Sequence, residues 1–305
     1  MKHRARFVSV ITAGVLGALL LAPPAAQAAP RCFGRMPDIV GTPGNDTLRG
    51  TSGSDVIVGL AGRDEILGRG GNDRLCGGRG RDAIAGQGGD DFLLGASEAD
   101  SPLAGGGGDD VVKGGSGRDF LVGQAGGDRL VAGSNGSIEF LFPGRGDDLV
   151  NGRSGFDLVT FFDAQTGVVV DLSLTTPQST GQGLDRLRGL EGLEGSAQSD
   201  TLDGNGAANL IFGLEGGDTI SGLALEDTLF GERGNDDLFG GEHDDFLDGG
   251  RGSGDFGDGG ETGETNGDTC ERLETEVNCE NPDRLSARAV PRGLQAIRLL
   301  RRAFG

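Results

Sequence analysis

Aspartate recurs at a fixed spacing of nine residues through most of this chain. In the first run it stands at Asp46, Asp55, Asp64, Asp73, Asp82 and Asp91, and an aliphatic residue follows two places later each time. After shifts in phase, the series continues at Asp110, Asp119, Asp128, Asp148 and Asp157. A second uninterrupted run holds Asp200, Asn209, Asp218, Asp227, Asp236 and Asp245. Carboxylates are hard oxygen donors, so this regular series indicates cation binding.

Glycine stands at the first, second and fourth positions of many of the nine-residue units, ahead of the aspartate at the sixth. Glycine permits tight turns and leaves backbone carbonyl oxygens accessible. Ca²⁺ takes about six to eight oxygen ligands, more than one turn supplies, so two stacked turns must hold each ion. If two units form one coil, the paired turns are 18 residues apart. Asp46 then pairs with Asp64, and Asp55 with Asp73; Asn209, which carries no charge, makes a weaker pair with Asp227.

The units GGRGRDAIA, GGSGRDFLV and GGEHDDFLD resemble the G-G-x-G-x-D-x-U-x repeat of hemolysin-type calcium-binding (RTX) proteins, where U is a large apolar residue. The resemblance implies an all-β fold, a right-handed parallel β-roll in which six residues turn and three form a short strand. It implies calcium as the cofactor, with the seventeen residues of the series as ligands and up to about ten ions. Stacked carboxylates repel one another without a cation, so folding is expected to depend on calcium.

The composition agrees with this interpretation and excludes others. Glycine contributes 62 of the 305 residues, and 47 acidic residues against 27 basic ones give a formal net charge of −20. Such a chain is poorly suited to nucleic acid, because nothing would neutralise the phosphates. The alternative is a disordered, glycine-rich acidic chain. That alternative does not explain why an aliphatic residue follows each aspartate at a fixed distance.

The first 28 residues have the layout of a secretory signal peptide. Lys2, Arg4 and Arg6 precede an apolar run, and Ala26-Gln27-Ala28 offers a cleavage site. The run is short for a membrane span. We therefore expect a secreted, extracellular protein that does not span a membrane. Four cysteines remain, Cys32, Cys76, Cys270 and Cys279, and they allow three disulfide pairings. Pairing near each end of the chain, Cys32 with Cys76 and Cys270 with Cys279, is favoured.

Interruptions in the repeats predict the domain boundaries. An N-terminal roll spans 29–160, a β insert 161–194, and a C-terminal roll 195–257, with the two rolls stacked. The insert contains TGVVVDLSL, whose alternation suits a short strand. Pro102 stands at an apolar position and predicts a broken strand there, and 132–142 lacks the repeat motif. A disulfide-closed cap spans 258–282, and a basic tail, typical of a short helix, spans 283–305.

No catalytic residues are expected. His243 is the only histidine after the leader, and neither an HExxH zinc motif nor a G-x-S-x-G elbow occurs. The sequence therefore predicts a calcium-binding repeat protein that is not an enzyme. Two alternatives stay open. One is a calcium-dependent adhesin or cell-surface matrix protein with a protein or surface-glycan partner, and the other is an accessory module of a secreted hydrolase.

Overall fold

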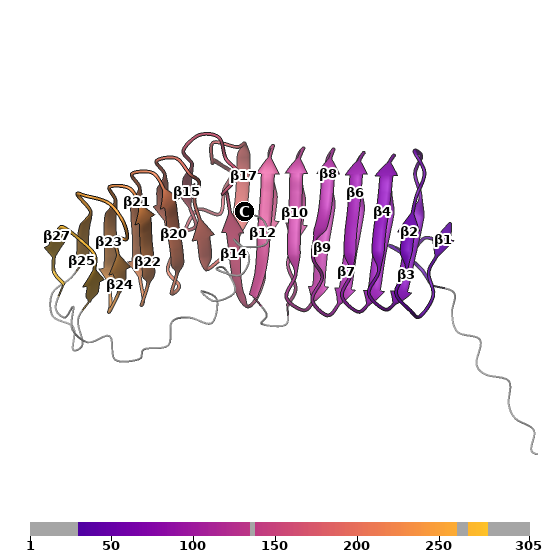
Figure 1. Cartoon of the computed structure of the whole chain (residues 1–305), viewed down its shortest axis with the longest axis horizontal. Coiled ribbons are helices and arrows are strands. Elements are labelled where there is room, and N and C mark those ends of the chain that lie inside the picture. Colours follow the sequence, from indigo (N-terminus) through magenta and orange to yellow (C-terminus); the bar gives the residue numbers. More distant parts are fainter. Residues whose placement is uncertain (1–29, 135–137, 261–267, 280–305) are drawn as a thin grey trace, which may run out of the picture.

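The computed structural model describes residues 30–134, 138–260 and 268–279, and within them it contains strands and turns but no helix. The strands stack side by side along one long axis, so the molecule is an elongated roll (Figure 1). The predicted all-β parallel roll is confirmed. The predicted signal peptide and basic tail lie outside the described residues. No helix of the described part is long and apolar enough to cross a membrane.

Three sheets form the walls of the roll. The nine-stranded sheet has the order β1 (Ile39–Val40), β3 (Val56–Ala61), β5 (Arg74–Arg79), β7 (Phe92–Ser97), β9 (Val111–Ser116), β11 (Arg129–Val131), β13 (Leu149–Asn151), β17 (Leu184–Arg188) and β16 (Gln178–Ser179). The twelve-stranded sheet has the order β2 (Thr47–Arg49), β4 (Glu65–Gly70), β6 (Ala83–Gly88), β8 (Leu103–Gly107), β10 (Phe120–Ala125), β12 (Ile138–Arg145), β14 (Phe156–Thr160), β18 (Gly192–Glu194), β20 (Leu210–Glu215), β22 (Thr228–Arg233), β24 (Phe246–Asp248) and β26 (Thr269–Glu271). The six-stranded sheet has the order β15 (Val169–Asp171), β19 (Thr201–Asp203), β21 (Thr219–Ala224), β23 (Asp237–Glu242), β25 (Phe256–Gly260) and β27 (Thr275–Val277).

Strand register follows the repeat. Ile57 pairs with Leu75 and Ile66 with Ile84, a spacing of 18 residues, so two units make one coil as predicted. Successive units alternate between the two walls, and each strand pairs in parallel with the strand one coil later. Among the described strands only β16 and β17 pair antiparallel, at one end of the nine-stranded sheet.

The aliphatic residue that follows each aspartate by two places points into the roll. Ile57, Ile66, Leu75 and Leu93 have no exposed surface, and one continuous cluster of such residues runs from Ile57 to Cys270. Burying each aliphatic side chain contributes roughly 1.5–3 kcal/mol. The interior is one side chain thick on each wall, which explains why the apolar residues recur every nine residues and not more often.

Replacing one interior side chain is expected to destabilise the whole roll. Ile84→Ala removes buried methyl groups between Ile66 and Leu103, whose interior positions lie in the same sheet, and should lower the free energy of unfolding by about 2–5 kcal/mol. Urea denaturation followed by circular dichroism measures this change. Val169→Ala is the control, because Val169 is 58% exposed and its truncation should cost less than ~1 kcal/mol. Equal losses in the two variants would contradict this account of the core.

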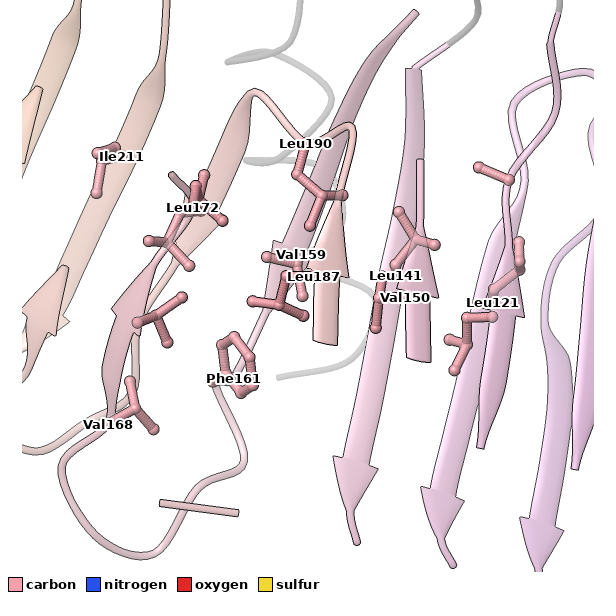
Figure 2. Packing of buried hydrophobic residues seen from close by; sticks show 14 of the residues in the cluster. Leu121, Leu141, Val150, Val159, Phe161, Val168, Leu172, Leu187, Leu190 and Ile211 are labelled. Atoms are coloured by element: carbon pink, nitrogen blue, oxygen red, sulfur yellow. The ribbon is translucent and has the colours of Figure 1, made fainter. Parts of the chain in front are cut away.

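Residues 161–194 are where one wall of the roll changes from the nine-stranded to the six-stranded sheet. The twelve-stranded sheet continues through this region by way of β14, β18 and β20, so it is shared by the N-terminal and C-terminal repeats. The predicted short strand is β15, and Val168, Val170 and Leu172 point inward from it and its flanks. With Phe161 they keep the core continuous across the change of sheet (Figure 2).

The prediction of a broken strand at Pro102 is wrong. The peptide bond between Ser101 and Pro102 is cis, and β8 begins at the next residue. Leu103 takes the interior position that Pro102 holds in the sequence pattern and pairs with Ile84, 19 residues earlier. The extra residue is absorbed ahead of the strand, so the ladder continues without a gap.

Both favoured disulfides are present. Cys32 and Cys76 are bonded with their Cα atoms 5.8 Å apart, and Cys270 and Cys279 with theirs 5.9 Å apart. Cys270 occupies an interior position opposite Leu247, as the sequence phase predicts. One disulfide therefore ties the segment before the first coils to β5, and the other closes the last described coil.

Candidate metal centres

The repeated aspartates lie in the turns, at the start of the strands, and form three columns along the roll. In each column the backbone N–H of one aspartate donates to Oδ1 of the aspartate one coil later. The N–H of Asp64 lies 2.9 Å from Oδ1 of Asp82, and that of Asp73 lies 2.7 Å from Oδ1 of Asp91. The turns 18 residues apart that the sequence pairs are therefore neighbours.

The first column follows the twelve-stranded sheet, the second the nine-stranded sheet, and the third the six-stranded sheet. The first column contains Asp46, Asp64, Asp82, Asp100, Asp119, Glu139, Asp157, Glu191, Asn209, Asp227, Asp245 and Asp268. The second contains Asp55, Asp73, Asp91, Asp110, Asp128, Asp148 and Asp185. The third contains Asp200, Asp218, Asp236, Asp255 and Glu274.

In most of these turns the second carboxylate oxygen, Oδ2, is buried without a hydrogen-bond donor. This holds for Asp64, Asp73, Asp82, Asp91, Asp100, Asp110, Asp119, Asp128, Asp148, Asp157, Asp218, Asp227, Asp236 and Asp255, whose side chains are at most 3% exposed. A buried carboxylate oxygen that no donor reaches costs free energy. A bound cation would remove that cost.

Glycine at the first position of the unit leaves space beside this oxygen. A Cβ atom at Gly59 would collide with Oδ2 of Asp64 and would lie 2.6 Å from the carbonyl oxygen of Gly77 in the next coil. The same arrangement recurs at Gly68, beside Asp73 and the carbonyl oxygen of Gly86. A carboxylate oxygen and backbone carbonyl oxygens thus surround a position that only glycine keeps open, and such hard oxygen donors suit Ca²⁺.

Burial raises the pKa of these carboxyls well above the usual range. The pKa reaches about 7 at Asp91 and about 8 at Asp100 and Asp148, first because of burial and further because of neighbouring carboxylates. A hydrogen bond from the backbone N–H of the preceding coil lowers the pKa and only partly offsets burial. Ionised carboxylates in these turns therefore require a compensating positive charge.

No group of three or more His, Cys, Asp or Glu side chains in the described residues is arranged around one metal position. Any ion in the turns must therefore take much of its coordination from backbone oxygens. A family model of the RTX calcium-binding nonapeptide repeat matches residues 40–75, 68–102, 103–136, 193–220 and 221–255, just over half of the chain. The protein belongs to the RTX calcium-binding nonapeptide repeat family. No curated protein matches the chain.

The RTX turns include carboxylates that the sequence analysis did not assign. Asp100 is buried in the first column, since the strand after it is intact. Asp185 ends the second column within Gly-Gln-Gly-Leu-Asp, a unit hidden in the predicted insert. Asp255 and Asp268 extend the other columns after units with inserted residues. A search for Gly-x-Gly-x-Asp that tolerates insertions would have found Asp185.

Two glutamates take the place of aspartate where the RTX motif is interrupted. Glu139 lies in 132–142, where the sequence shows no motif, and it pairs in register with Asp157. Both side chains have no exposed surface, and no donor reaches any of their four carboxylate oxygens. Burial, together with Glu139, raises the pKa of Asp157 to about 9. Glu191 follows in the same column and accepts a hydrogen bond from the N–H of Asp157.

Four predicted ligands are placed differently. Oδ2 of Asp46 and Asp55, the carboxylate of Asp200 and Oδ1 of Asn209 accept hydrogen bonds from their own turns. The sequence analysis treated these turns as equal to the others, because their aspartate or asparagine stands at the same phase.

Proposed function

We propose that this protein is an exported calcium-binding repeat protein whose β-roll forms when Ca²⁺ binds between stacked turns. The observation that carries the proposal is the row of buried Oδ2 atoms without donors beside glycine positions that a Cβ atom would fill. Such a row is unstable as a set of bare anions and stable as a set of cation ligands. Membership of a calcium-binding repeat family supports calcium as the ion.

Export and the absence of catalysis are part of the same proposal. The leader-like first 28 residues support secretion, and two disulfides suit an oxidising compartment. The turn carboxylates are engaged by backbone N–H groups and are shielded from solvent, which suits structural metal binding better than attack on a substrate. On this proposal the product of calcium binding is a stiff roll in the extracellular space.

Adding calcium to the metal-free mature protein at pH 7.5 is expected to produce β structure and a heat of binding. Far-UV circular dichroism measures the first and isothermal titration calorimetry the second, and a chelator should reverse both. Mg²⁺ at the same concentration should be much less effective, because it demands near-ideal octahedral geometry. The same β content with and without calcium, and no heat of binding, would sink the proposal.

A matched pair of variants separates turn ligands from general acidity. Asp91→Asn removes a buried carboxylate from the second column, and Asp90→Asn removes the exposed carboxylate next to it. Both lose one negative charge, but only Asp91→Asn should weaken calcium binding, by about tenfold or more at the sites that share this turn. Equal effects of the two variants would point to nonspecific attraction by surface charge.

A further inference from the structure

The turns of this roll are of two kinds, which we call open and closed. In an open turn Oδ2 of the aspartate is buried and receives no donor, as at Asp64 and Asp91. In a closed turn the residue directly after the first glycine donates its backbone N–H to the side chain at the sixth position. The closed turns are those of Asp46, Asp55, Asp200 and Asn209.

The closed turns share a short polar residue at the second position. The N–H of Thr51 lies 2.6 Å from Oδ2 of Asp55, and its hydroxyl donates to the same oxygen at 2.9 Å. Thr42 bonds Asp46 in the same way at 2.6 and 3.0 Å. Ser196 holds both oxygens of Asp200, at 2.6 and 2.8 Å, and the N–H of Asn205 donates to Asn209 at 2.7 Å.

In the open turns the second residue has a different backbone conformation. Its φ is positive, as at Gly78 (115°), Gln87 (79°) and Ala96 (92°), which precede Asp82, Asp91 and Asp100. The second residues of the closed turns are not among the positive-φ residues. The choice between open and closed is therefore visible in one dihedral angle and one side chain.

Closed turns stand at the ends of the carboxylate columns. Asp46 begins the first column, Asp55 the second and Asp200 the third, while Asn209 follows the glutamate that interrupts the first column. The second column ends at Asp185, whose Oδ2 accepts a hydrogen bond from the buried hydroxyl of Thr180. Each run of open turns is thus bounded by a turn in which the protein itself supplies the missing donor.

We propose that the residue after the first glycine decides which turns bind calcium, so that open turns take the ions and closed turns end the ion columns without one. This inference rests on the proposed calcium binding and restricts it to the open turns. The physical reason is coordination. A turn at a column end has a neighbouring turn on one side only, too few oxygens for Ca²⁺, and a hydroxyl with an N–H satisfies its carboxylate instead.

The number of ions bound by variants of the full mature chain tests this assignment, with CaCl₂ as the titrant in calorimetry. Gln87→Thr places a hydroxyl and a β-branched side chain where φ is positive, which such residues avoid, so it should close the turn of Asp91. Gln87→Ala is the matched control, because Ala96 already occupies this position in an open turn. We expect at least one ion fewer for Gln87→Thr than for Gln87→Ala.

The reverse change keeps the test decisive even if Gln87→Thr does not fold. Thr51→Gly removes the hydroxyl and permits positive φ, so the turn of Asp55 should open and the protein should bind one ion more than the wild type. Equal ion numbers in Thr51→Gly and the wild type would overturn the inference while leaving calcium binding intact. A wild-type protein that binds no calcium would instead overturn the proposed function itself.

Discussion

Without calcium, the protein is expected to hold its β-roll near pH 4 and to lose it as the pH rises past about 6. The folded-state pKa is raised to about 6 at Asp110, Asp119 and Asp236, and to about 7 at Asp128 and Asp218. The unfolded chain has aspartate pKa values near 3.9. A raised folded pKa means that the folded state binds more protons, so its stability is fully present below about pH 4 and falls above it.

The size of this effect follows from the number of carboxyls. A rise of the pKa from 3.8 to about 6 corresponds to roughly 3 kcal/mol of lost stability per carboxyl once the pH exceeds the folded value. A few such groups exceed the 5–15 kcal/mol or so by which domains are stable. With calcium bound the carboxyls must be ionised, so the dependence reverses and acid should release the ions.

Circular dichroism of protein freed of calcium on a chelating resin, scanned from pH 4 to pH 8, measures the transition. Light scattering must be followed in parallel, because the sequence pI of about 4.4 favours association in this range. The same scan with excess calcium is the control and should show β structure at neutral pH. If the metal-free protein is equally unfolded at pH 4 and pH 8, the burial of these carboxyls is not what opposes folding.

Gly216→Ala is expected to destabilise the C-terminal repeats by on the order of 3 kcal/mol or more. Gly216 is the fourth residue of its unit and has φ of 133°, a conformation that residues with a Cβ rarely adopt. An added Cβ would also lie 2.5 Å from the carbonyl oxygen of Gln198 and 2.9 Å from the nitrogen of Ser199 in the preceding coil. The coils cannot separate locally, because the ladder bonds join them on both sides of the turn.

Gly206→Ala is the matched control in the same group of coils. An added Cβ there would meet no atom within 4 Å, and Gly206 does not have positive φ. This variant should be neutral or more stable by up to about 1 kcal/mol, since alanine reduces the freedom of the unfolded chain. Urea denaturation at saturating calcium compares the two. Similar stabilities would show that the coil spacing yields to the extra atom.

The nine-residue period was enough to predict the parallel roll, its two-unit coil and the interior side chains. Period determines these because each unit is a turn plus a short strand, and a residue such as Leu75 returns to the same interior position every second unit. The cysteine pairing was favoured on the same basis, since Cys270 falls at the phase of a buried residue. Spacing in the sequence and position in the roll are nearly the same variable here.

Insertions limited the prediction, because a loop can absorb extra residues without disturbing the ladder. Leu103 replaces Pro102 at the interior position, and Glu139 stands where the phase predicts an aspartate. The sequence shows these as breaks in the motif. Only the register of the strands identifies them as continuations, because backbone pairing with the neighbouring coils decides which residue faces inward.

By itself the sequence determined the repeat, the oxygen-rich turns and the direction in which the apolar side chains face, since all three follow from local turn geometry and a fixed period. Only the tertiary structure decided which turns have an oxygen left for a cation. Thr51 and Gln87 stand at the same place in their units, yet one turn is satisfied by its own N–H and hydroxyl and the other is not. That difference depends on backbone dihedrals and on the turn in the next coil, and neither can be read from spacing.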